Sequence, residues 1–228
     1  MRYSKFIAGL TLATCSSLAS AGLVIDSINV QMVSTTFTAR HLGGTDEERY
    51  TAALNAFESS EGSVCSQDLG ALEGVSYSGT CGGGKRNYGA LYTITGSLSG
   101  GAEFQFGLDW GRGGFIFADS AGAPLDYFNE DIWWSKNWGN SDVKSYVLAD
   151  AGDFSLTLLG FEGCCDGINS AQYRTWETPE ISSFSESPQI PVGNASEWST
   201  LEVNAVPVPG SLPLMAVGAL LLWRRRQS

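Results

Sequence analysis

Residues 91–118, LYTITGSLSGGAEFQFGLDWGRGGFIFA, decide the fold class of this chain. Short runs of β-branched and aromatic residues alternate here with small or polar ones, and glycine-rich turns separate the runs. The same arrangement continues between residues 131 and 203 in the segments DIWW, VKSYVLA, DFSLTLLGF, AQYRTW and EWSTLEV. Regular short strands separated by turn residues predict an all-β domain, an antiparallel β-sandwich or jelly roll.

The segments before residue 91 are less regular. Residues 22–40 are rich in Val, Ile, Thr and Phe, which predicts one or two strands. Residues 46–58 place apolar side chains at helical spacing behind three acidic residues, which predicts one short helix. Residues 59–88 are rich in Ser and Gly, so we expect a loop that needs a disulfide to hold it.

Charge and length limit the function classes. The chain has 228 residues, which suits one domain with end segments. All 24 acidic residues lie between Asp26 and Glu202, whereas five of the 13 basic residues lie at the two ends, so the middle carries 24 acids against 8 bases. A domain this acidic repels nucleic acids and anionic lipid head groups. We therefore expect no nucleic-acid partner, and we expect one domain over residues 22–205, with an irregular loop at 177–197.

The N-terminus has the three parts of a secretory signal. Arg2 and Lys5 form the basic region, an apolar stretch follows, and Ala19-Ser20-Ala21 is a small-x-small cleavage site. We expect residues 1–21 to form a signal helix that is removed after Ala21. A buried N-terminal helix is the alternative, and a lipoprotein-like box that ends at Cys15 is a poorer fit.

The C-terminus combines a short proline-containing motif, an apolar span and a basic cluster. The motif is Val206-Pro207-Val208-Pro209, and the cluster is Arg224-Arg225-Arg226. The stretch from Val206 to Trp223, which includes the motif, has 18 residues, near the ~17–25 that cross a bilayer, and arginines stay on the cytoplasmic side. We therefore expect a membrane-spanning helix that leaves the acidic domain outside the cytoplasm, with a simple tail anchor as the alternative.

This tail resembles the PEP-CTERM sorting signal of Gram-negative bacteria. In that family an exosortase recognises the motif, the span and the arginines, and cleavage sends the protein to the cell surface or extracellular matrix, often with exopolysaccharide. Val208 stands where the family usually has Glu. The resemblance implies that residues 206–228 are a sorting segment, that an exosortase-type enzyme is a partner, and that the precursor is anchored in the inner membrane.

Four cysteines remain after the signal: Cys65, Cys81, Cys164 and Cys165. An even number in an exported chain indicates disulfides, with three possible pairings. Cys65–Cys81 would close a short loop, worth ~3 kcal/mol in the chain-entropy model. Cys164 and Cys165 would then bond to each other, although adjacent Cα atoms lie only ~3.8 Å apart. The alternative bonds each of them separately to Cys65 and Cys81, which is awkward because neighbours on a strand point to opposite faces. We expect a vicinal-disulfide turn at Cys164-Cys165-Asp166-Gly167, after the strand 153–161.

A second resemblance involves the same cysteines. The strings Asp109–Gly114, Asp131–Trp134 and Gly160–Gly167 resemble the CCXG type of PEP-CTERM proteins, which combine a Cys-Cys-x-Gly signature with the same sorting tail. The resemblance implies an address and a β-rich module rather than a reaction.

Catalytic motifs are few. His41 is the single histidine, so a His-based metal site is excluded and a Ser-His-Asp triad would depend on this residue alone. Gly111–Gly114 does not follow a βαβ pattern, which argues against a phosphate loop. Acidic residues are plentiful enough for a glycosidase pair, but their spacing singles out none. We expect a non-enzymatic binding or structural module associated with exopolysaccharide; a carboxylate-based glycan-active hydrolase is the alternative.

The candidate ligand-binding residues are aromatic and acidic: Trp133, Trp134, Trp138, Asp109, Glu162 and Asp166. An indole face can stack on a sugar ring while carboxylates bond its hydroxyls. Neighbouring residues of a strand point to opposite faces, so one of the first two tryptophans can be buried and the other exposed. The alternative is that these rings fill the core.

Calcium is the one cofactor that the sequence suggests. It prefers six to eight oxygen ligands, and the loop 126–131 together with Glu162 and Asp166 could supply carboxylates. The spacing is not that of an EF-hand, and solvated loop acids are the alternative interpretation.

Overall fold

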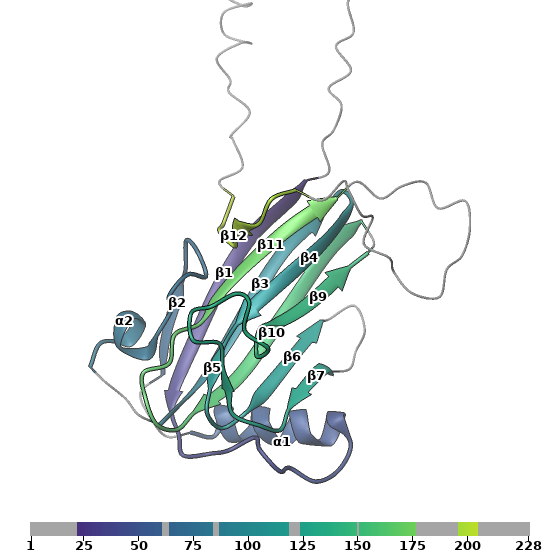
Figure 1. Cartoon of the computed structure of the whole chain (residues 1–228). Coiled ribbons are helices and arrows are strands. Elements are labelled where there is room, and N and C mark those ends of the chain that lie inside the picture. The colour runs from purple at the N-terminus through teal and green to yellow at the C-terminus, as the bar shows by residue number, and fades with distance from the viewer. Residues whose placement is uncertain are drawn as a thin grey trace, which may run out of the picture.

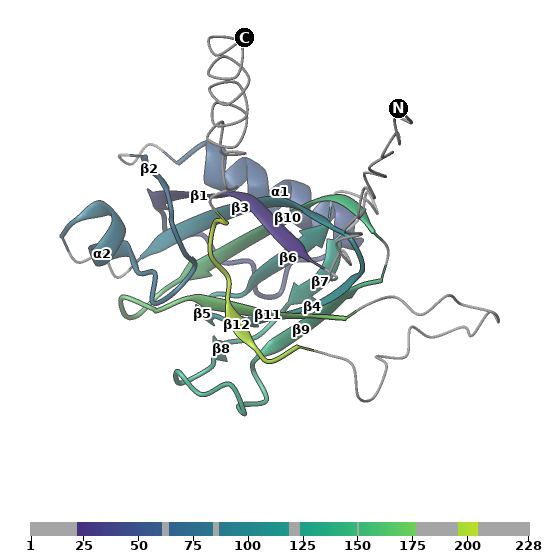
Figure 2. The ribbon, with the colours of Figure 1, turned by 90° about the horizontal axis from the view of Figure 1, so that it is seen from above.

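The computed structural model describes residues 22–60, 64–83, 87–118, 124–149, 151–176 and 196–204. These residues form two antiparallel sheets that pack face to face, a small two-stranded sheet and two short helices (Figures 1 and 2). The signal segment, the sorting segment and all but the last two residues of the 177–197 loop lie outside the described residues. None of the helices in the described ranges combines the length and apolar character needed to span a membrane.

The larger sheet has six strands. Their order is β2 (Cys65–Asp68), β1 (Leu23–Ser34), β3 (Tyr88–Leu98), β10 (Gly152–Glu162), β6 (Gly114–Ala118) and β7 (Pro124–Phe128). The two central strands, β3 and β10, pair without interruption from Leu98↔Gly152 to Tyr88↔Glu162. Because β1 starts opposite Leu98, the chain enters the sheet at the end where β10 begins.

The smaller sheet covers one face of the larger one (Figure 2). Its order is β12 (Ser199–Thr200), β11 (Ser170–Trp176), β4 (Gly101–Gly107) and β9 (Lys144–Leu148). After β12 the chain returns to the larger sheet, where the amide of Asn204 donates to the carbonyl of Ile25 and the Ile25 amide donates to Asn204 Oδ1, both at 3.1 Å. The two ends of the described domain therefore lie side by side.

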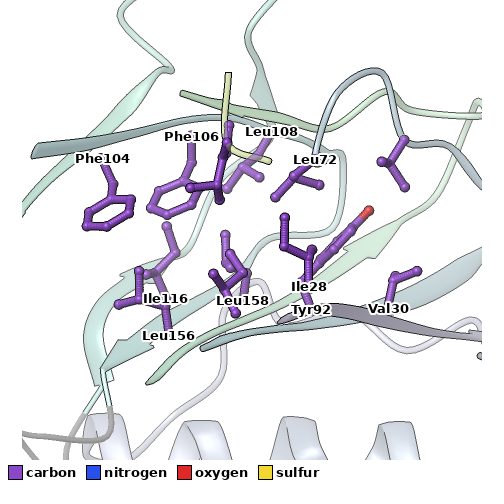
Figure 3. Packing of buried hydrophobic residues seen from close by; sticks show 14 of the residues in the cluster. Ile28, Val30, Leu72, Tyr92, Phe104, Phe106, Leu108, Ile116, Leu156 and Leu158 are labelled. Atoms are coloured by element: carbon purple, nitrogen blue, oxygen red, sulfur yellow. The ribbon is translucent and has the colours of Figure 1, made fainter. Parts of the chain in front are cut away.

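Alternating side chains of the two sheets form the core between them. Phe104 and Phe106 of β4 face Leu156 and Leu158 of β10, and Ile28 of β1 packs beside them (Figure 3). All of these residues are at most 1% exposed. A two-residue period of apolar side chains on both sheets is what a sandwich requires, so the predicted sandwich is confirmed.

The opposite face of the larger sheet also carries apolar side chains, and helix α1 (Asp46–Glu58) covers part of this face. Leu159 and Phe161 of β10 and Phe115 of β6 pack there against Phe57 of the helix. This explains why the β10 sequence is apolar on both faces over its second half. The helix starts at the predicted residue because Thr45 caps it in a capping box with Glu48.

The prediction of a single helix is wrong. A second short helix, α2 (Tyr77–Cys81), lies in the segment that the sequence predicted as loop. Ser76 caps it by accepting from the amide of Gly79, and Gly82 ends it with a positive φ of 73°. The predicted Cys65–Cys81 disulfide is confirmed and ties α2 to β2, with 5.6 Å between the Cα atoms. The disulfide makes so short a helix tenable.

Candidate functional site

The chain leaves β10 in a sharp turn, residues 163–167, which we name the Cys-Cys turn. The sulfurs of Cys164 and Cys165 are bonded to each other, and both residues are exposed. The turn lies at the end of the larger sheet where β10 pairs with Tyr88, opposite the end where β1 enters. It leads through Ile168 and Asn169 into β11, and so connects the two sheets.

Glu162 holds this turn from inside. Its carboxylate is fully buried and accepts four backbone N–H groups. Oε2 accepts from Gly111 at 2.8 Å, whereas Oε1 accepts from Gly163 and Cys164 at 2.8 Å and from Cys165 at 3.3 Å. The oxygens of Glu162 are thus used within the fold, where they gather the amides of the turn, and its role in ligand binding stays a prediction.

Three more contacts fix the outer part of the turn. The amide of Ser78 in α2 donates to both carboxylate oxygens of Asp166, at 3.0 and 3.1 Å. The buried hydroxyl of Tyr88 donates to the carbonyl of Gly167 at 3.2 Å. The indole N–H of Trp134 donates to the carbonyl of Ile168 at 2.7 Å. Hydrogen bonds from Ser78 of α2, Tyr88 of β3 and Trp134 thus hold the turn together with Ile168, which follows it.

Glycines let the parts of the site approach closely. A Cβ at Gly167 would lie 2.7 Å from the carbonyl oxygen of Asp109 and 3.0 Å from its side chain. A Cβ at Gly107 would overlap the ring of Trp134. At these two positions glycine is required by space rather than by backbone conformation.

A two-stranded ribbon forms the opposite side of the site. β5 (Asp109–Trp110) pairs with β8 (Ile132–Trp133), and Asp109 lies opposite Trp133. Trp133 is 62% exposed, whereas its neighbour Trp134 is 5% exposed, as the alternation of strand side chains requires. The half-buried Trp138 packs on Trp134 with 4.8 Å between ring centroids.

A pocket of about 220 Å³ opens between the ribbon and the Cys-Cys turn. It is lined by Asp109, Trp133, Trp134, Ser135, Lys136, Asp166 and Ile168. Four of the six candidate ligand-binding residues thus lie together, with Trp138 packed on Trp134 and Glu162 inside the fold.

Three lining residues were not predicted from the sequence: Ser135, Lys136 and Ile168. Ser135 and Lys136 have positive φ values of 56° and 53°. Such a left-handed pair is unusual for residues other than glycine, and it turns the chain back after Trp134. In the sequence, Ser135 and Lys136 stand between Trp134 and Trp138, but this position alone did not identify them as pocket residues.

Asp109 is the electrostatically unusual member of the pocket. Burial, and next the charge of Glu162, raise the pKa of Asp109 to about 6, with a further contribution from Asp131. Its carboxyl group therefore exchanges a proton near neutral pH, which a carboxyl in water does not do. Lys136 is the one basic side chain in the described lining of the pocket.

The residues suggested for calcium do not converge in the described part of the chain, where no three His, Cys, Asp or Glu side chains could hold a metal ion. The predicted loop 126–131 is corrected in part, because its residues 126–128 belong to strand β7, where Asp126 accepts from the hydroxyl of Tyr146 at 3.1 Å. His41 is exposed, with its backbone amide donating to Asn129.

Neither a protein-family model nor a curated protein matches the chain. Three solved structures resemble it in fold. The crystal structure of the PA14 domain of the antifreeze protein MpAFP has a TM-score of 0.40 and 11% identity over 71% of this chain and 86% of that chain. The PA14 sugar-binding domain from an RTX adhesin has a TM-score of 0.40 and 11% identity over 67% of this chain and 91% of that chain. The epithelial adhesin 9 A domain from Candida glabrata, in complex with Galβ1-4GlcNAc, has a TM-score of 0.42 and 8% identity over 82% of this chain and 93% of that chain. The function proposed below rests on this chain's own residues.

Proposed function

We propose that this chain is an exported surface or matrix module that binds polysaccharide in the pocket between the β5–β8 ribbon and the Cys-Cys turn, without catalysing a reaction. One observation carries the proposal: Trp133 is 62% exposed at the rim of a concave pocket whose lining includes two carboxylates. Large aromatic side chains are normally at least partly buried in a monomeric domain, and an exposed one beside converging polar groups is typical of a binding site.

The geometry suits a sugar ring. The free indole face of Trp133 offers an apolar platform, while Asp109 and Asp166 offer acceptors for hydroxyl hydrogens. The pocket volume of about 220 Å³ accommodates one or two sugar units rather than a long enclosed chain, so a polymer would cross it and extend into solvent. The contacts that hold the Cys-Cys turn fix these acceptors before a ligand arrives, which lowers the entropy lost on binding.

The proposed address combines the two ends of the sequence with the disulfide. The N-terminal signal and the PEP-CTERM-like tail imply export, anchoring in the inner membrane and processing by an exosortase. The Cys65–Cys81 disulfide supports an oxidising compartment outside the cytoplasm. A surface destination would bring the pocket into contact with exopolysaccharide.

The alternative function is a carboxylate-based glycan hydrolase. One observation favours it: the pKa of Asp109, raised to about 6, is suited to a general acid, and a second carboxylate, Asp166, lines the same pocket. Against it, Asp166 accepts the Ser78 amide with both oxygens, which suits a structural acceptor better than a nucleophile.

A glycan array and a turnover assay on the purified domain, residues 22–204, separate the two functions. Binding without product, weakened severalfold by Trp133→Ala and retained in Trp198→Ala, supports the proposal. Trp198 is the matched control because it packs on Arg174 at the smaller sheet, outside the pocket. Release of shorter oligosaccharides that is lost in Asp109→Asn would establish the hydrolase instead. Absence of both binding and turnover across glycans would refute the proposed pocket function.

A further inference from the structure

We propose that the pocket selects a sugar with a free ammonium group, as in a de-N-acetylated hexosamine polymer, held between the indole face of Trp133 and the carboxylates of Asp109 and Asp166. This inference rests on the proposed glycan binding and names the class of glycan. It follows from the charges around the pocket, from the exposure of the indole and from the fixed position of the turn.

The pocket lining carries more negative than positive charge. The described lining has two carboxylates and one ammonium, Lys136. Glu162 does not line the pocket and accepts four backbone amides, and the Arg112 side chain, which lies against Gly163, forms no ion pair with it. The two ion pairs found among the described residues, Arg49–Asp46 and Arg174–Glu103, involve no residue of the pocket. Neither Asp109 nor Asp166 therefore forms an ion pair within the described chain, although Lys136 lines the same pocket, and a ligand can supply a cation to the second carboxylate.

The pKa of Asp109 reflects the burial and the negative charges around this carboxyl group. Its raised pKa has burial as the largest cause, followed by the charge of Glu162 and then that of Asp131, so its ionised form is disfavoured first by desolvation and then by neighbours of like sign. A cation that enters the pocket reverses that disfavour, because an opposite charge nearby stabilises the carboxylate. A neutral hydroxyl or an N-acetyl group can donate a hydrogen bond to the carboxylate but brings no opposite charge, so it stabilises the ionised form less. This difference separates an amino sugar from its acetylated form.

Trp133 adds to the same preference. The face of an indole attracts a cation through its quadrupole and attracts the apolar face of a sugar ring by contact. A hexosamine with a free amine presents both, and its ammonium has three N–H donors for the carboxylates of Asp109 and Asp166. The Cys-Cys turn keeps Asp166 in place through the Ser78 amide, so the acceptors are arranged before binding.

The test compares three oligosaccharides of equal length and linkage, made of glucosamine, N-acetylglucosamine or glucose, by isothermal titration calorimetry. We expect the glucosamine oligomer to bind about tenfold more tightly than the other two, and this preference to weaken with salt. Trp133→Ala should weaken its binding about two- to fivefold or more.

Charge variants decide between a specific site and general attraction to an acidic protein. Asp166→Asn should lower the glucosamine preference several-fold, whereas Asp153→Asn removes the same charge at an exposed position at the start of β10 and should leave it unchanged. Lys136→Gln should raise the affinity about two- to threefold, because it removes a charge of the same sign as the ligand.

Three results would overturn the inference. Equal binding of all three oligosaccharides would refute the ammonium preference while leaving glycan binding intact. Equal loss in Asp166→Asn and Asp153→Asn would show non-specific attraction. Weaker binding in Lys136→Gln would show that the ligand presents an anion to this lysine. If the domain bound no glycan of any class, the proposed function would fail as well.

Discussion

Glu162→Gln tests how the Cys-Cys turn is held. The carboxylate has two oxygens and receives four N–H groups, three at Oε1 and one at Oε2. A glutamine side chain keeps one oxygen, which would face the three amides of the turn. Its NH₂ group would then face the amide of Gly111, so two donors would point at each other in a fully buried place.

The magnitude follows from these contacts. An unsatisfied buried donor costs about 1–3 kcal/mol, and the three remaining hydrogen bonds change from charged to neutral acceptors, which weakens each. Removing the buried charge returns part of this, because the carboxylate no longer has to be desolvated. We expect a net loss of about 2–3 kcal/mol in the free energy of unfolding. In a domain of this size that lowers the melting temperature by about 5–10 °C.

Thermal and urea unfolding followed by tryptophan fluorescence measures the effect. The matched control is Glu73→Gln, the same change at an exposed position, which should stay within about 0.5 kcal/mol of the wild type. If Glu162→Gln and Glu73→Gln unfolded at the same midpoint, the carboxylate would not be the anchor of the turn, and the reasoning would be refuted.

Three further predictions concern the pocket walls, the pH dependence and the cysteines. Gly107→Ala should lower the melting temperature and weaken glycan binding because its methyl group would overlap Trp134, whereas Gly70→Ala, which has nothing within 4 Å, should change neither; equal effects would count against the close packing. The folded state binds the Asp109 proton more tightly than the unfolded state does, so this group's stabilisation is complete below about pH 4 and is lost as the pH rises through about 6. The difference in free energy of unfolding between Asp109→Asn and the wild type, measured with urea, should therefore favour the variant by about 1 kcal/mol more at pH 8 than at pH 4. This value is reduced because the position is half-exposed, and an unchanged difference at the two pH values would contradict the prediction. Peptide mapping of the unreduced protein should give a fragment of the Cys-Cys turn with no link to Cys81, and a cross-linked fragment would exclude the vicinal pairing.

Local signals predicted the elements that local interactions determine. The helix α1 begins and ends at the predicted residues because its acidic first turn, its capping box and its apolar spacing all lie within residues 45–58. Most strands were predictable for the same reason, since alternation is visible in a short window. Two were not predicted: β2 lies in the segment 59–88 that was expected to be a loop, and β7 includes residues 126–128 of the loop suggested for calcium. The helix α2 was not, because a five-residue helix has little propensity of its own and depends on a disulfide to a strand earlier in the chain.

The pocket could be predicted in part. Trp133 and Asp109 were identifiable by residue type, but their direct pairing across β5 and β8 depends on the sheet, which brings together residues far apart in the chain. Glu162 and Asp166 looked alike in the sequence, as two acids beside the cysteines. Only the fold separates the buried carboxylate, which receives four amides, from the one at the rim of the pocket.

The paired ends of the domain set the direction in which the pocket faces. Ile25 and Asn204 are hydrogen-bonded to each other near the end where β10 begins, and the Cys-Cys turn follows the other end of that strand. Eleven residues of β10 at ~3.3 Å each make this separation about 35 Å. The sandwich therefore separates the pocket from the paired ends by the length of one strand, so an attachment at either end would leave the Trp133 side of the pocket facing away from the support.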